Sequence, residues 1–92
     1  MSDTKAADWR PTKSPDLWLK ILDGEAVILD RSNDRVHQLN EVATFMLECC
    51  DGLRSQDDIV AAVVKRYSVD RQTATRDAAE LLTSLRHLGI VA

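Results

Sequence analysis

The sequence predicts an α+β domain of winged-helix type, in which a three-stranded antiparallel β-meander is followed by three α-helices. Two observations predict this order. Bulky, β-favouring residues surround Asp23-Gly24, a strong hairpin signal because the tight turn needs positive φ angles. Downstream, three polar capping residues each precede apolar positions at helical spacing. The length of 92 residues suits one small hydrophobic core.

The chain divides into a polar N-terminal tail at residues 1–15 and a single domain at residues 16–92. The tail contains Pro11 and Pro15 and shows no hydrophobic periodicity. Trp9 is its one aromatic residue. The sequence leaves open whether this side chain folds back onto the domain.

The strands are expected at residues 17–22, 26–29 and 35–39, with short polar turns between them. The first two flank the Asp23-Gly24 turn. The third is moderately β-favouring and leads directly into the first helix. Because strands joined by short turns usually pair as neighbours, we expect a meander whose first and third strands are its edges.

Each helix is expected to begin after a capping residue. The first follows Asn40, is apolar on nearly every side and ends at Asp51-Gly52. The second follows Ser55, where Asp58 completes an approximate capping box. The third follows Asp70 and carries a stripe with helical spacing, widened by a further leucine. The stripe comprises Ala74, Ala78, Leu81, Leu85 and Leu88, and the additional residue is Leu82.

Charge and composition indicate a cytoplasmic protein that binds neither nucleic acid nor a membrane. The net charge is -3 and neither half of the chain is basic, which disfavours phosphate contacts. No apolar run approaches the roughly 20 residues that span a bilayer. Met1–Trp9 lacks the apolar core of a secretory signal. Cys49 and Cys50 are adjacent, which predicts two reduced, mostly buried thiols.

No catalytic or cofactor motif is present in the sequence. It lacks a phosphate-binding loop, a dinucleotide fingerprint, an esterase elbow and a zinc-protease motif. Cys49 and His37 are a conceivable nucleophile and base, but burial in an apolar segment raises a thiol's pKa and makes it inert. The set of His37, His87, Cys49 and Cys50 does not match the spacing of any known zinc-ligand pattern. We therefore expect no enzyme activity, no cofactor and no metal.

The alternative class is a winged-helix DNA-binding regulator. The second and third helices would form a helix-turn-helix pair whose second helix begins with residues able to contact bases. These residues are Arg71, Gln72, Thr73 and Arg76. Flanking Asp70 and Asp77, the acidic chain and the lack of a basic wing after the third helix argue against this class.

The edge of the third strand is a candidate peptide-binding site. Its backbone groups could accept an extended peptide as a fourth strand, with specificity supplied by neighbouring side-chain pockets. Residues of the third helix beside its core stripe would wall the resulting groove. These residues are Thr75, Ala79, Leu82 and Arg86, of which Ala79 and Leu82 would receive apolar side chains and Arg86 an acidic one. Alternatively, the tail or Ile90-Val91 covers this edge, and the residues alone do not decide.

Several segments, in this order and spacing, resemble the PqqD family of pyrroloquinoline quinone synthesis proteins. The segments are Asp23-Gly24-Glu25-Ala26-Val27-Ile28-Leu29, His37-Gln38-Leu39-Asn40-Glu41-Val42-Ala43, Cys50-Asp51-Gly52, Ile59-Val60, Tyr67-Ser68-Val69-Asp70 and Leu85-Arg86-His87-Leu88-Gly89-Ile90-Val91. The resemblance extends over about residues 15–91, nearly the whole chain.

This resemblance implies a non-catalytic chaperone, a recognition element for ribosomally synthesised and post-translationally modified peptides. Such a protein holds the leader of a precursor peptide and presents the rest to a modifying enzyme, such as a radical SAM protein. The pathway implied is pyrroloquinoline quinone biosynthesis or that of a related natural product. The leader is expected to lie between the third strand and residues 75–86 of the third helix. The strand residues are Arg35, Val36, His37, Gln38 and Leu39.

Overall fold

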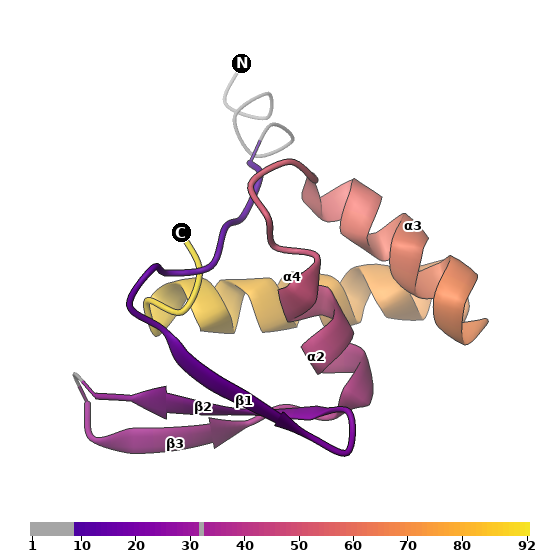
Figure 1. The fold of residues 1–92 in the computed structure, drawn as a ribbon. Coiled ribbons are helices and arrows are strands. Elements are labelled where there is room, and N and C mark those ends of the chain that lie inside the picture. The colour runs from indigo at the N-terminus through magenta and orange to yellow at the C-terminus, as the bar shows by residue number, and fades with distance from the viewer. Residues whose placement is uncertain (1–8, 32) are drawn as a thin grey trace.

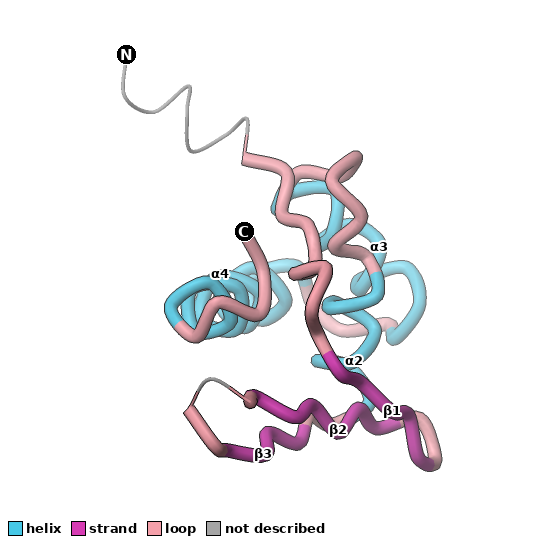
Figure 2. Tube along the Cα trace, turned by 60° about the vertical axis from the view of Figure 1, so that its left-hand side comes forward, coloured by secondary structure: helices cyan, strands magenta, loops and turns pink. Residues whose placement is uncertain are grey.

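The computed structural model describes residues 9–31 and 33–92 and confirms the predicted α+β order. The strands are β1 (Trp18–Leu22), β2 (Glu25–Asp30) and β3 (Arg35–Gln38). The helices are α2 (Glu41–Glu48), α3 (Gln56–Tyr67) and α4 (Arg71–His87). The strands form one antiparallel sheet in the order β1-β2-β3. The helices lie together on one face of this sheet (Figures 1 and 2).

The turn between β1 and β2 has the predicted tight geometry. Asp23 and Gly24 both have positive φ angles, 53° and 80°, so the two-residue turn follows the twist of the strands. Leu22 and Glu25 are the first paired residues on either side. This turn fixes the register of the first hairpin.

All three predicted helix caps are present. The Asn40 side chain accepts a hydrogen bond from the Ala43 N–H at 2.8 Å. The Asp58 N–H donates to Ser55 Oγ at 3.2 Å, and the Ser55 N–H donates to Asp58 Oδ2 at 3.0 Å, which completes the capping box. The Asp70 carboxylate accepts from the Thr73 N–H at 3.1 Å. Local side-chain chemistry therefore sets where each helix begins.

The core lies between the sheet and the three helices. Side chains alternate along β2, and Ala26 and Ile28 are the buried ones that face the helices. The largest fully buried side chains from the helices are Leu47, Ile59, Val60, Val63 and Leu82.

Both thiols belong to the core, as predicted. Cys49 and Cys50 are buried and unpaired. Desolvation raises the pKa of Cys49 and raises that of Cys50 to about 11. Protonated thiols in an apolar interior are poor nucleophiles.

The second half of the predicted tail packs against the domain. Thr12 exchanges two backbone hydrogen bonds with Ala92, at 3.1 and 2.9 Å, and the Ser14 N–H donates to the Ile90 carbonyl at 2.9 Å. The Arg86 guanidinium lies 4.8 Å from the centre of the Trp9 ring. Trp9 therefore folds back onto α4. The rest of the predicted tail, residues 1–8, lies outside the described residues.

None of the helices in the described part of the chain is long and apolar enough to cross a membrane.

Candidate functional site

Two strand edges are unpaired in the described part of the chain, one on β1 and one on β3. The C-terminal residues do not cover β3. Val91 instead forms a bridge with Lys13, and Ala92 bonds to Thr12. This pairing resolves one alternative left open by the sequence, because Ile90-Val91 are occupied by the N-terminal segment.

The outer edge of β3 presents two residues with free backbone groups. The Leu39 N–H donates to the Ala26 carbonyl at 2.9 Å, so residue 39 directs its N–H toward β2. Backbone groups alternate in direction along an antiparallel strand. His37 and Arg35 therefore also point toward β2, whereas Val36 and Gln38 direct their N–H and C=O groups outward. These four groups can pair with an added strand.

The side chains of β3 divide between the two faces of the sheet. His37 is paired with the buried Ile28 and therefore faces the helices, as do Arg35 and Leu39. The side chains of Val36 and Gln38 lie on the opposite face of the sheet, away from the helices, and Val36 is 66% exposed. A strand added beside β3 would place alternate side chains on the helix side.

His37 lies at the centre of this helix-facing side. Its side chain is 19% exposed, and Nε2 lies 3.5 Å from Asp30 Oδ2. Nε2 is buried and makes no hydrogen bond with the described residues. The Asp30 carboxylate is held by the Asn33 side-chain amide at 2.9 Å and by the Asn33 N–H at 3.2 Å. These hydrogen bonds, led by the side-chain one, lower the pKa of Asp30.

Thr44 fixes the end of β3 against α2. It is 3% exposed, and its Oγ1 accepts a hydrogen bond from the Ala26 N–H at 2.8 Å. The same hydroxyl donates to the Leu39 carbonyl at 3.3 Å. A single buried hydroxyl therefore joins β2, the end of β3 and α2, and holds the first turn of α2 in a fixed position.

One cavity lies at each end of β3, and both are bordered by α4. The cavity near the end of β3 has a volume of about 300 Å³ and is lined by Asn40, Val42, Ala43, Met46, Asp77, Glu80 and Leu81. The cavity near its start has about 360 Å³ and is lined by Asn33, Arg35, His87 and Leu88. Because β3 and α4 run in opposite directions (Figure 1), the later residues of α4 lie near the start of β3. We use the name β3–α4 groove for these two cavities together with the strand edge from Arg35 to Asn40 that lies between them.

The helix face that borders the groove differs from the predicted one. Successive helical residues are rotated by about 100°, which places Asp77, Leu81 and Leu88 on one side of the buried stripe. Thr75, Ala79 and Arg86 lie on the opposite side of that stripe. Arg86 stacks on Trp9, away from the groove.

The buried stripe itself accounts for the remaining predicted residue of α4. Leu82 is fully buried, so its side chain is part of the core and is not available to a ligand. Leu81 is half-buried and borders the cavity. The structure therefore does not bring the four predicted residues of α4 together with the edge of β3, although none of residues 9–31 and 33–92 pairs with that edge.

The chain resembles a protein family and a curated protein. A family model described as coenzyme PQQ synthesis protein D (PqqD) matches residues 25–91. The PqqA binding protein of Rhodopseudomonas palustris (strain TIE-1) is 34% identical over 58 residues, which are 63% of this chain and 57% of that protein. The matched region thus spans little more than half the length of this curated relative.

Two solved structures of leader-peptide complexes share the fold. TbiB1 in complex with the TbiA(beta) leader peptide has a TM-score of 0.75 at 25% identity, over 87% of this chain and 93% of that chain. Lasso peptide synthetase B1 complexed with the leader peptide has a TM-score of 0.77 at 27% identity, over 91% of this chain and 99% of that chain.

Proposed function

The chain belongs to the coenzyme PQQ synthesis protein D (PqqD) family, and on that premise we propose that it binds the leader of a precursor peptide as a fourth strand beside β3. The observation that carries this proposal is the free edge of β3, with outward backbone groups on Val36 and Gln38, next to the β3–α4 groove. The relative's name and the peptide-bound neighbours support it.

Backbone pairing alone is too weak to explain specific binding. Four backbone hydrogen bonds contribute roughly 0.5–1.5 kcal/mol each, and ordering an extended peptide offsets about 2–5 kcal/mol. The cavities at the two ends of the groove must therefore supply the remaining affinity through side-chain contacts. Backbone pairing sets the position of the leader, and the cavities select its sequence.

The protein acts by holding its ligand and presenting it to a modifying enzyme, and it has no catalytic step of its own. Two buried thiols with raised pKa values support this part of the proposal, since neither is suited to nucleophilic attack. Free cysteines also fit a reducing compartment, so the cytoplasm is the location that we propose.

Peptide selection from a displayed random library tests the proposal. We expect the native protein to enrich a family of extended peptides. The variants Val36→Pro and Gln38→Pro remove one outward N–H each without removing a bond to β2, and we expect them to lose these peptides.

Ile21→Pro is the matched control for this experiment. It introduces the same ring at an outward position on the other edge of the sheet, and it should retain the enriched peptides. Retention of the same peptides by Gln38→Pro, with the fold intact by circular dichroism, would refute strand addition at β3.

A further inference from the structure

The β3–α4 groove carries opposite charges at its two ends. We infer that it selects a leader segment in which a lysine or arginine precedes an aspartate or glutamate by four or six positions. This inference rests on the proposed function and specifies the sequence class of its ligand.

The cavity near the end of β3 is suited to a long cationic side chain. Its interior is apolar, formed by Val42, Ala43, Met46 and Leu81, and its rim carries Asp77 and Glu80. Lysine and arginine combine an apolar stem with a charged head, which matches an apolar interior and an acidic rim. The Arg76 guanidinium lies 3.8 Å from Asp77, but both side chains are more than half exposed, so this pair is weak.

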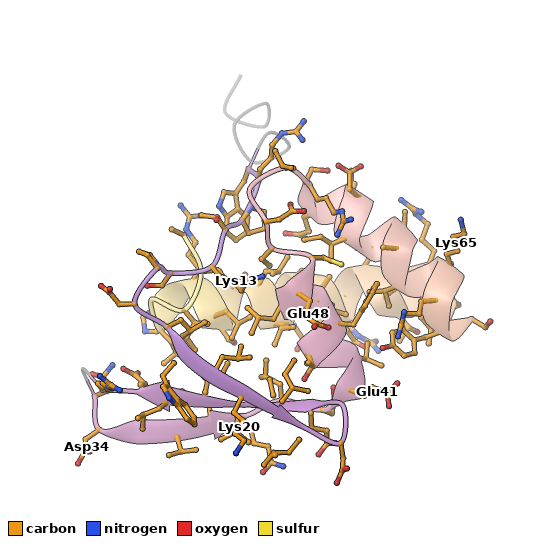
Figure 3. All side chains as sticks on the ribbon, viewed as in Figure 1. Lys13, Lys20, Asp34, Glu41, Glu48 and Lys65 are labelled. Atoms are coloured by element: carbon orange, nitrogen blue, oxygen red, sulfur yellow. The ribbon has the colours of Figure 1, made fainter. Side chains whose placement is uncertain are left out.

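The cavity near the start of β3 is suited to a carboxylate. Arg35 and His87 border it, together with Asn33 and Leu88. Asp34 follows Asn33 in the turn, but its side chain points away from the sheet and the helices (Figure 3). Asp30 is already engaged by the Asn33 amide and N–H.

Hydrogen bonds partly offset the negative C-terminal end of α4 at this position. The last carbonyl groups of a helix usually carry a partial negative charge. Here the N–H groups of Leu88, Gly89 and Ile90 donate to carbonyls of the final turn, at 2.9–3.1 Å. These bonds occupy the carbonyls of Ser84, Leu85 and Arg86, and Arg35 is the cationic side chain that lines the cavity.

Strand geometry gives the order and the spacing of the two charges. The existing pairs in the sheet are antiparallel, and antiparallel pairing is the more stable kind. An antiparallel leader would begin near the acidic cavity and end near Arg35. The strand from Arg35 to Asn40 covers roughly 17 Å. Because side chains facing the helices recur at every second residue, two charges that reach both cavities are four or six positions apart.

Peptides of identical composition test the inference. From the library-selected family, one peptide is made with lysine first and aspartate later, and a second with the two residues exchanged. At low salt we expect the first to bind the native protein roughly three- to tenfold more tightly, as measured by calorimetric titration. Raising the ionic strength should reduce this ratio.

The double variant Asp77→Asn/Glu80→Gln should remove the preference for lysine at the first position. Glu48→Gln/Asp57→Asn is the matched control, since it removes the same charge from sites outside the groove and should retain the preference. If the two peptides bind the native protein equally and both are lost in Gln38→Pro, strand addition stands and the charge order is refuted. If binding survives Gln38→Pro, the proposed function itself fails.

Discussion

The two edges of the sheet are alike in backbone but different in surroundings. By the same alternation, β1 directs the backbone groups of Leu19 and Ile21 outward, as β3 does those of Val36 and Gln38. Each edge is flanked by a helix and a cavity. Unpaired backbone groups therefore do not distinguish β1 from β3 as a binding edge. The difference must come from the neighbouring side chains.

The cavity beside β1 is bordered by the chain's own N-terminal segment. It has a volume of about 290 Å³, is mainly apolar, and is lined in part by Lys13, Ser14 and Leu17. Lys13 donates from Nζ to the Glu48 carbonyl at 3.5 Å, and both residues lie on this side of the molecule (Figure 3). The two cavities beside β3 are not lined by this segment. The one near the end of β3 has acidic Asp77 and Glu80, and the one near its start has Arg35 and His87. This contrast supports the proposal that β3 is the edge that receives the ligand.

Proline substitutions at inward positions should give the largest effect. His37→Pro on β3 and Lys20→Pro on β1 each remove an N–H that points toward β2 and leave a carbonyl of β2 without its partner. We expect each to lower the free energy of unfolding by about 1–3 kcal/mol, measured by urea denaturation. The outward substitutions Gln38→Pro and Ile21→Pro should cost clearly less. Equal losses at inward and outward positions would contradict the assigned alternation.

Peptide binding should slow amide exchange at one edge only. With a saturating library-selected peptide, we expect the N–H groups of Val36 and Gln38 to exchange at least about tenfold more slowly, because both become hydrogen-bonded. Leu19 and Ile21 should be unchanged in the same spectra. Protection at β1 would show that the ligand uses the other edge.

The elements of the fold were predictable because local residues determine them. Asp23-Gly24 accepts the positive φ angles of a two-residue turn, and Asn40, Ser55 and Asp70 each bond the first turn of a helix. Such interactions span a few residues, so the sequence displays them directly. The packing of residues 9–15 was not predictable, since it depends on backbone bonds to Ile90 and Ala92, far away in the chain.

The helix face that borders the groove could not be predicted for a related reason. Leu81 and Leu82 are adjacent and equally apolar, so the pattern locates the stripe on α4 but not the side that meets the sheet. The structure buries Leu82 completely and leaves Leu81 at the cavity. A sequence signal was nevertheless present, because Asp77 and Glu80 flank the Leu81 side of the stripe. It has meaning only once the free edge of β3 is known.

Removing the N-cap of α2 should weaken peptide binding as well as lower the free energy of unfolding. Asn40→Ala removes the cap and should cost about 1 kcal/mol in the free energy of unfolding. Ser55→Ala should cost a similar amount at α3, away from both edges. Because Asn40, Val42 and Ala43 line the acidic cavity, only the first variant should also weaken peptide binding in calorimetric titration. Equal peptide affinities in Asn40→Ala and Ser55→Ala would show that the first turn of α2 does not contribute to peptide binding.

The smallest effect is expected at the β2–β3 turn, which leads into the proposed ligand-binding edge. Side-chain hydrogen bonds of Asn33 hold this turn, whereas the β1–β2 turn relies on Gly24. The Asn33 side chain lowers the pKa of Asp30 below its ordinary 3.8, so this interaction stabilises the fold fully above that value and is lost as pH falls through the lowered one. Asn33→Ala should raise the pKa of Asp30. The native protein should therefore be the more stable of the two at neutral pH, and the difference should shrink in acid. NMR titration of the Asp30 carboxyl carbon measures its pKa, and urea denaturation across the same pH range measures the free energy of unfolding. An unchanged pKa of Asp30 in Asn33→Ala would show that the Asn33 amide does not cause the lowered pKa.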